Sequence, residues 1–171
     1  TTIRTKDAMR YAAGFYDPSR IVKAFAGISN ANNDYSNDIV IRGNSSRGLL
    51  WRLEGIEIPN PNHFSDGQGG SGGAFSAITS NVIDNFDFFT GAFPAEYGNA
   101  FSGVMDLNLR KGNSDKREYA FQTGMIGAEI SMEGPVTKRS DASYLFNARY
   151  TSFKFLNDLK IIDLEETNVA P

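Results

Sequence analysis

The segment from Leu49 to Pro59, LLWRLEGIEIP, decides the fold class. Its β-branched, aromatic and leucine residues are typical of strands, and Glu54-Gly55 in the middle predicts a tight reversal or bend. Pro59 ends the second strand, because proline has no amide proton to give to a sheet. With 17 glycines and 12% aromatic residues in the chain, the segment indicates sheets and tight turns rather than a helix bundle.

Further elements follow on both sides of this segment. Asp17-Pro18 predicts a helix over about 18–26, since aspartate caps free amide groups and proline is tolerated at the first helical position. The sequence also predicts strands at 39–43, 86–90 and 103–110, a short helical turn at 80–85, and a single helical turn at 91–98.

The pattern changes after residue 113. Residues 117–132 and 142–155 alternate over long stretches, with a turn-like connector at 133–141. In the second stretch Tyr144, Phe146, Ala148 and Tyr150 fall on one face and mostly polar residues on the other. This pattern fits a bilayer-spanning strand, which needs about 9–11 residues, and it also fits a half-buried strand of a soluble sheet. Residues 156–171 show no clear pattern.

Composition excludes several classes of protein. The chain of 171 residues has a net charge of -3 and no cysteine, which excludes disulfides, thiol nucleophiles and cysteine-ligated metals. Its charge balance disfavours nucleic acid as a partner. The sequence contains no run of about 18 apolar residues, so it predicts no membrane-spanning helix. The N-terminal Thr-Thr-Ile-Arg is not a signal peptide.

Two glycine-rich motifs overlap in one segment. Residues 67–72, GQGGSG, match the dinucleotide fingerprint, and residues 69–73, GGSGG, match the nucleophile elbow of hydrolases. A loop rather than a strand precedes both, and His63 is the sole histidine available as a base, so we expect a flexible loop. Asn44-Ser45-Ser46 matches a glycosylation sequon, a motif frequent by chance. The scattered carboxylates define no acid/base pair, and we expect neither catalytic residues, nor a cofactor, nor a metal site.

Three segments together resemble a known family. They are DIVIRG at 38–43, LLWRLEGIEIP at 49–59 and FFTGAFPAEYGNAFSGVMDL at 88–107. Their order and spacing resemble the plug domain of TonB-dependent outer-membrane receptors, and this version looks like the Bacteroidetes branch. The resemblance covers about residues 7–155. Two residues depart from the family pattern: Glu54 stands in place of the usual aspartate, and Thr90 stands where many members carry an arginine.

The resemblance implies an α+β fold. We expect a plug-type mixed sheet of about four strands with short helices, followed by one or two strands from an incomplete outer-membrane barrel. The implied domains are a plug at 1–113 and the truncated start of the transmembrane barrel at 114–171. The implied function is that of a gate, which occludes the barrel and takes part in substrate binding and energy-coupled uptake. It is not that of an enzyme.

The resemblance also implies site residues. Three segments occupy the positions of substrate-contacting loops in the family. The alternative is that they are ordinary polar loops without a role in binding. Their residues are Asn32, Asn33 and Tyr35, then Asn44, Ser45 and Arg47, and then Asn62, His63 and Phe64. Arg42 and Glu96 are candidates for a lock between plug and barrel, although the exchange at Thr90 puts a two-arginine lock in doubt.

The implied partners are TonB, the chain's own barrel, an extracellular substrate and, as a further candidate, a surface lipoprotein. We expect the TonB-binding segment upstream of residue 7. Two other interpretations stay open from the sequence. One is a soluble binding module, for instance for glycans, that uses the same loops and an exposed Trp51. The other is a receptor that acts mainly in signalling.

Overall fold

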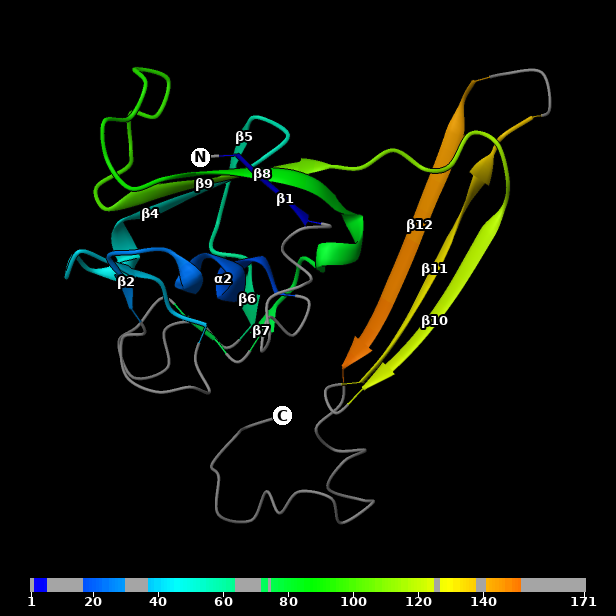
Figure 1. Cartoon of the computed structure of the whole chain (residues 1–171), viewed down its shortest axis with the longest axis horizontal. Coiled ribbons are helices and arrows are strands. Elements are labelled where there is room, and N and C mark those ends of the chain that lie inside the picture. Colours follow the sequence, from blue (N-terminus) through cyan, green and yellow to red (C-terminus); the bar gives the residue numbers. More distant parts are fainter. Residues whose placement is uncertain are drawn as a thin grey trace, which may run out of the picture. The chain divides into compact units, whose positions relative to one another are not determined.

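The structure is a computed structural model that describes residues 2–5, 17–29, 37–63, 72–73, 75–124, 127–137 and 141–151. The chain divides into two compact units, Thr1–Arg110 and Lys111–Pro171, and each is described by itself (Figure 1). Within the described residues, no helix has the length and apolar character needed to cross a membrane.

A five-stranded mixed sheet forms the centre of the first unit. Its strand order is β1-β8-β9-β4-β5, with strands β1 (Thr2–Arg4), β4 (Leu49–Leu53), β5 (Ile56–Ile58), β8 (Ile83–Phe89) and β9 (Gly103–Leu109). Strands β4 and β9 run parallel, and the other neighbours are antiparallel. The predicted mixed sheet with short helices is confirmed, and it has five strands rather than about four.

The predicted hairpin at 49–58 is present. Glu54 and Gly55 have φ values of 52° and 77°, the pattern of a two-residue type I′ turn. The amide of Glu54 donates to Leu107 O at 2.9 Å, and its side-chain Oε1 accepts from Leu109 N. The glutamate that replaces the family aspartate therefore reaches the end of the neighbouring strand β9.

The predicted helix at 18–26 is shorter in the structure. Helix α2 spans Pro18–Ile21, and a 3-10 turn, η1 (Val22–Ala24), follows it. Asp17 is the N-cap, as expected, and its Oδ1 accepts from Ser19 N at 2.8 Å. The helix ends early because Phe25 is extended and Gly27 turns the chain into β2 (Ile28–Ser29), which pairs with β3 (Val40–Ile41).

Other predicted boundaries also differ. The strand predicted at 39–43 is shorter in the structure, where only β3 (Val40–Ile41) is extended and paired. In the predicted helical turn at 80–85 only η4 (Ser80–Val82) is helical, because Ile83 already pairs with β9. Residues 91–98 form no helical turn, because Gly91 (φ 153°) and Ala92 (φ 52°) are outside the right-handed helical region. A hydrogen bond from Tyr97 N to Pro94 O closes a β-turn there.

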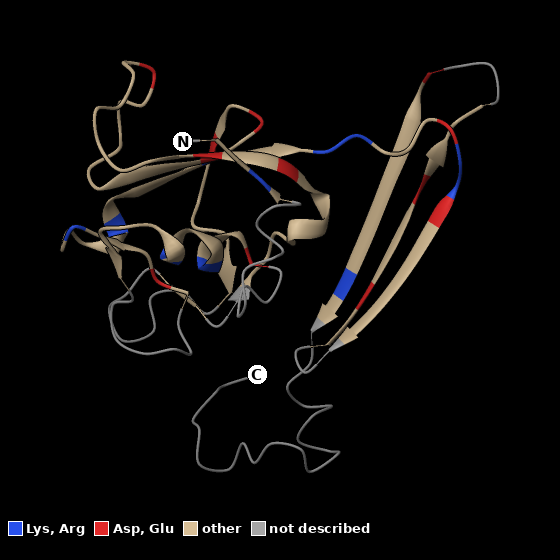
Figure 2. Cartoon of the chain, in the orientation of Figure 1, with Lys and Arg blue, Asp and Glu red and all other residues tan. Residues whose placement is uncertain are grey.

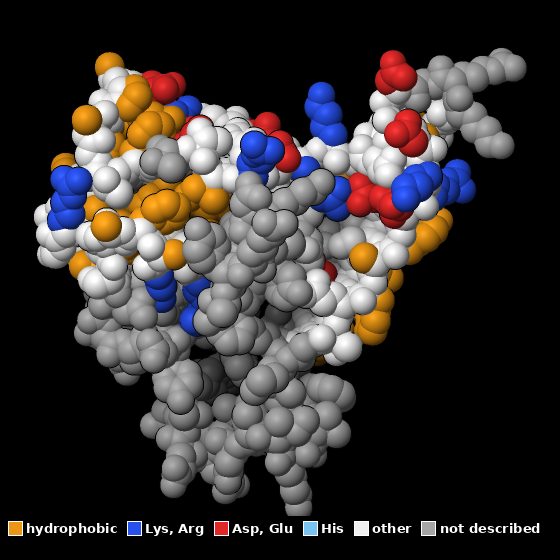
Figure 3. Space-filling model, viewed as in Figure 1, with side chains coloured by type: hydrophobic (Ala, Val, Ile, Leu, Met, Phe, Trp, Pro, Cys, Tyr) orange, Lys and Arg blue, Asp and Glu red, His pale blue; other side chains and the backbone are white. Residues whose placement is uncertain are grey.

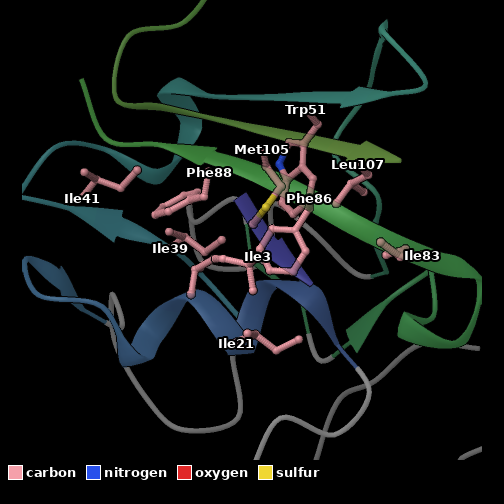
Figure 4. Packing of buried hydrophobic residues seen from close by; sticks show 11 residues of the cluster. Ile3, Ile21, Ile39, Ile41, Trp51, Ile83, Phe86, Phe88, Met105 and Leu107 are labelled. Carbon is pink, nitrogen blue, oxygen red and sulfur yellow. The ribbon is translucent and has the colours of Figure 1, made fainter. Parts of the chain in front are cut away.

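The main core lies between one face of the sheet and helix α2 (Figure 4). Phe86, Met105 and Leu107 are fully buried, and Trp51 is 4% exposed, so the exposed Trp51 of the binding-module interpretation is wrong. Ile21 of α2 and Ile39 complete the same cluster. A second, smaller cluster of Leu50, Tyr97 and Val104 covers the opposite face.

Two short elements and one more 3-10 turn complete the first unit. Strands β6 (Asn62–His63) and β7 (Phe75–Ser76) pair antiparallel, and η2 (Ser46–Gly48) precedes β4. Gly73 lies beside β6, where an added Cβ would clash with the carbonyl oxygen of His63. Only glycine fits this close approach of two backbones.

The second unit is an antiparallel three-stranded sheet. Its strands are β10 (Glu118–Gly124), β11 (Gly127–Pro135) and β12 (Ser143–Thr151). Three strands are present where the sequence analysis predicts one or two, because the alternating stretch at 117–132 reverses between Gly124 and Gly127, which pair with each other. The predicted connector at 133–141 begins later, since β11 continues to Pro135. A hydrogen bond from Val136 N to Ala142 O closes that turn.

The faces of this second sheet differ in character. The aromatic face of β12 is exposed as the alternation predicts, with Tyr144 37%, Phe146 50% and Tyr150 72% exposed. The register places apolar residues of β10 and β11 on the same face, and Figure 3 shows hydrophobic side chains along this sheet. The other face is polar: Asn147 Nδ2 donates to Glu129 Oε1 at 2.7 Å and to Ser131 Oγ at 2.8 Å.

Candidate functional site

Arg42 stands at the tip of a turn. Arg42 and Gly43 have φ values of 49° and 79°, and Asn44 N donates to Ile41 O at 2.9 Å. A left-handed conformation costs a non-glycine residue about 1–2 kcal/mol. The amide of Arg42 donates to Gly27 O at 2.8 Å, which holds the backbone in place. The exposed guanidinium therefore projects from a fixed position.

Glu96, the other lock candidate, lies in a different environment. Its side chain is 61% exposed, and its Oε2 is 3.8 Å from Nη1 of Arg52. Glu96 thus lies next to an arginine, Arg52, that the sequence analysis did not single out. A role of Arg42 and Glu96 in contact with a barrel stays a prediction.

Arg52, Asp106 and Tyr97 form a charged cluster on the second face of the five-stranded sheet. Arg52 and Asp106 are register partners in the parallel pair β4–β9, and Arg52 Nη1 lies 3.6 Å from Asp106 Oδ2. The Tyr97 hydroxyl donates to the same Oδ2 at 3.1 Å. The guanidinium carbon of Arg52 is 4.9 Å from the centre of the Tyr97 ring, within cation–π range. Figure 2 shows charged residues in the strands of this unit.

The environment of Tyr97 favours its neutral form. Burial raises the pKa of the Tyr97 hydroxyl, and the hydrogen bond to Asp106 together with the negative charges of Asp106 and Glu96 raises it further, against the opposing effect of Arg52. The hydroxyl therefore remains a hydrogen-bond donor at neutral pH. Asp106 Oδ1 is buried and has no hydrogen-bond partner within the described residues.

This cluster fastens the segment between β8 and β9 to the sheet. Tyr97 packs on Leu50 and Val104, and its ring centre is 5.4 Å from that of Phe89. The sequence carried a partial signal for it: Asp106 alternates with Asn108 and Arg110 on one face of the strand predicted at 103–110, whereas Arg52 shares its strand face with the apolar Leu50. The pairing itself was not foreseeable, because the two residues are far apart along the chain.

Three of the predicted substrate-facing residues occur in one turn. Asn44, Ser45 and Arg47 are exposed, and Ser45 Oγ accepts from Arg47 N at 3.3 Å, so Ser45 also caps η2. Their contact with substrate stays a prediction.

The other predicted substrate-facing residues separate into two groups. His63 is exposed in β6, whereas Asn62 is 9% exposed and its Oδ1 accepts from Asn37 Nδ2 at 2.7 Å. The remaining four, Asn32, Asn33, Tyr35 and Phe64, lie outside the described residues, as does most of the glycine-rich segment at 67–73. Among the residues that the structure describes, no three histidine, cysteine, aspartate or glutamate side chains gather as metal ligands would.

Solved structures share this fold. The siderophore receptor PirA from Acinetobacter baumannii matches with a TM-score of 0.60 and 18% identity over 88% of this chain and 24% of that chain. The outer membrane transporter YddB from Escherichia coli matches with a TM-score of 0.51 and 15% identity over 78% and 23%. A mutant of the ferric enterobactin receptor PfeA from Pseudomonas aeruginosa matches with a TM-score of 0.50 and 18% identity, over 81% of this chain and 22% of that chain.

At these identities the similarity shows the fold, which is that of the corresponding part of outer-membrane receptors. The chain spans about a quarter of the length of those structures. No curated protein matches the sequence.

The family of the chain is shown by a match to a protein-family model. The model of the TonB-dependent Receptor Plug Domain matches residues 2–104, more than half of the chain. The chain therefore belongs to the TonB-dependent receptor plug domain family, and the plug resemblance of the sequence is confirmed. This is a family of outer-membrane receptors rather than of enzymes. The assignment to the Bacteroidetes branch stays a prediction.

Proposed function

We propose that this chain is the gate of a TonB-dependent outer-membrane transporter. The first unit would occlude the barrel, take part in substrate binding and rearrange when TonB pulls on a segment upstream. The observation that carries this proposal is the match of residues 2–104 to the family model of the TonB-dependent receptor plug domain. A surface lipoprotein is a further candidate partner.

The substrate class has a first candidate. Two of the similar structures are named as a siderophore receptor and a ferric enterobactin receptor. Iron chelates are therefore the first class to test, before cobalamin, glycans and peptides. The exposed Asn44, Ser45, Arg47 and His63 offer hydrogen-bonding groups for such a ligand.

We propose the second unit as the start of the barrel. Strands of seven, nine and nine residues approach the length that crosses a bilayer, about 9–11 residues. Tyr119, Phe121 and Tyr150 are 68–73% exposed on the apolar face, whereas Glu129 and Asn147 pair on the polar one. Lipid outside and a polar lumen inside would suit this arrangement. The structural matches cover 78–88% of the chain, more than the first unit alone can supply.

The gate proposal is tested on the full-length receptor. Residues 2–110 are deleted, and single-channel conductance in planar lipid bilayers is compared with that of the intact receptor. We expect a large, lasting conductance in the deletion variant and little in the intact receptor. A receptor with Asn108→Ala serves as the control, because it keeps the whole plug. Equal conductance of the deletion variant and the intact receptor would overturn the proposal.

A further inference from the structure

The connector at 111–117, between β9 and β10, is fastened to the strands of the second unit, to which it belongs. It forms neither helix nor strand. The backbone N–H of Asn113 donates to Glu133 Oε2 at 2.8 Å, and its side-chain Nδ2 donates to Glu118 Oε2 at 2.8 Å. Its Oδ1 accepts from the backbone N–H groups two and three residues further on, at 2.8 Å and 3.2 Å. One residue therefore attaches the connector to β10 and β11 and also shapes the turn that follows it.

The two glutamates that Asn113 contacts face each other. Glu118 and Glu133 are register partners in the pair β10–β11, and both are half-buried on the polar face that also carries Ser131 and Asn147. Like charges directly opposite one another destabilise a sheet. A hydrogen bond to an ionised carboxylate is about twice as strong as one between neutral groups. The two N–H donors of Asn113 therefore offset part of the repulsion at this point of the sheet.

Gly112 brings the connector against the third strand. A Cβ added at this position would clash with the backbone carbonyl group of Tyr144 in β12, so only glycine fits this close approach. Tyr144 is the register partner of Gly134, the neighbour of Glu133. All three contacts thus lie at the end of the sheet where β10 and β12 begin and β11 ends (Figure 1). The connector contacts every strand of the second unit.

We propose that Gly112 and Asn113, held by Glu118 and Glu133, form an anchor that makes Lys111 the limit of movement of the first unit. The proposal rests on the proposed function, in which the first unit rearranges while the strands of the barrel stay in place. A free connector would act as a hinge and would loosen together with the first unit. The anchored connector keeps its position, and a displacement of the first unit stops before Gly112. Asn113 and Glu133 are positioning residues in this device.

Hydrogen exchange of the full-length receptor in detergent, read by mass spectrometry, tests where the movement stops. Phe86→Ala loosens the first unit, because it leaves a cavity in the core of that unit. We expect exchange at 83–89 and 103–109 to rise by about a hundredfold or more, with exchange at 111–117 unchanged. If 111–117 exchanges faster together with 103–109, the connector moves with the first unit and the proposal is overturned.

Two variants of Glu133 test the anchor itself. Glu133→Ala removes the acceptor of Asn113 N, so exchange at 111–117 should rise about fivefold, the effect of losing one hydrogen bond. A peptide over 127–132 should not change. Glu133→Gln keeps an acceptor oxygen and should restore most of the protection at 111–117. Ser131→Ala is the matched control, since it lies on the same face of β11 and bonds Asn147 instead.

A further variant tests the ion pair as another attachment of the connector. Lys116 Nζ lies 2.7 Å from Glu118 Oε1, and both side chains are exposed, so the pair should contribute little. Exchange at 111–117 should therefore be nearly the same in Lys116→Ala as in the unaltered receptor. An effect as large as that of Glu133→Ala would assign the attachment to the ion pair and would overturn the anchor.

The anchor is also overturned if Glu133→Ala leaves exchange at 111–117 unchanged, or if Glu133→Gln raises it as much as Glu133→Ala. None of these measurements depends on transport or conductance, whereas the gate experiment does. Failure of the anchor and failure of the gate function are therefore distinguishable.

Discussion

The two units use the same alternation of apolar and polar residues with opposite results. In β8 and β9 most apolar side chains are buried, and Phe86 and Met105 have no exposed surface, although Leu109 at the end of β9 is exposed. In β10 and β12 the apolar side chains are exposed, while Glu129 and Ser131 of β11 are 7% and 9% exposed. A period of two tells which residues share a face, and the surroundings decide which face is covered.

The largest expected effect contrasts two phenylalanines. Phe86→Ala should lower the free energy of unfolding of the first unit by about 3–5 kcal/mol, because it leaves a cavity in a packed core. Phe121→Ala removes a side chain that is 73% exposed and should cost the second unit less than about 0.5 kcal/mol in detergent. Urea unfolding, followed by the fluorescence of Trp51, the single tryptophan of this chain, measures the effect of Phe86→Ala. Hydrogen exchange of β11 measures the effect of Phe121→Ala. Similar losses in both units would remove the contrast.

A charge on the exposed face sharpens the comparison. Phe121→Arg should cost about 2–4 kcal/mol of assembly free energy if this face meets the middle of the bilayer. Gln122→Arg, on the opposite face, should cost little. The measurement is the fraction of full-length receptor that resists SDS unfolding after membrane insertion. If both variants assemble equally well, the face does not contact lipid.

The cluster around Tyr97 makes the first unit sensitive to alkaline pH. The raised pKa of Tyr97 means that folding favours the neutral hydroxyl. Its contribution is therefore complete below the ordinary tyrosine pKa of about 10 and is lost as pH rises through the folded pKa. Tyr97→Phe should cost about 1 kcal/mol at neutral pH and should flatten the decline in stability as pH rises above about 10. Unfolding free energies across that range check both expectations, and an unchanged decline in the variant would contradict them.

The smallest effect concerns the strand end that Glu54 closes. Glu54→Ala should lower stability by about 0.5 kcal/mol, because Leu109 N loses its acceptor but is exposed to water, which replaces it. Glu54→Gln keeps an acceptor oxygen and should lose less. Thermal unfolding of both variants provides the test, and equal losses would mean that the turn conformation rather than the hydrogen bond sets the cost.

Local chemistry made part of this fold predictable. Asp17-Pro18 predicted a cap and Glu54-Gly55 predicted a turn, because each acts within a few residues. The reversal between Gly124 and Gly127 was missed, since Met125-Ile126 lacks the asparagine or aspartate that marks tight hairpins. Strands of two residues, such as β6 and β7, are too short to show a period.

The sites depended on distant pairing. Asn37 finds its partners 20, 25 and 36 positions away, and no local pattern announces such contacts. Arg52 meets Asp106 because β4 and β9 are neighbours in the sheet, which requires the strand order. The family resemblance predicted the fold and its order of segments, and it did not predict these contacts.

The place of β1 in the sheet has a consequence for timing. Thr2 pairs with Asp87, 85 positions further along. A chain that emerges N-terminus first, at about 5–20 residues per second, leaves β1 waiting roughly 4–17 s for its neighbour. Throughout that interval a strand with an unpaired edge is open to wrong partners. Any factor that shields Thr2–Arg4 until Asp87 has been synthesised would therefore raise the yield of correctly folded protein without altering its final stability.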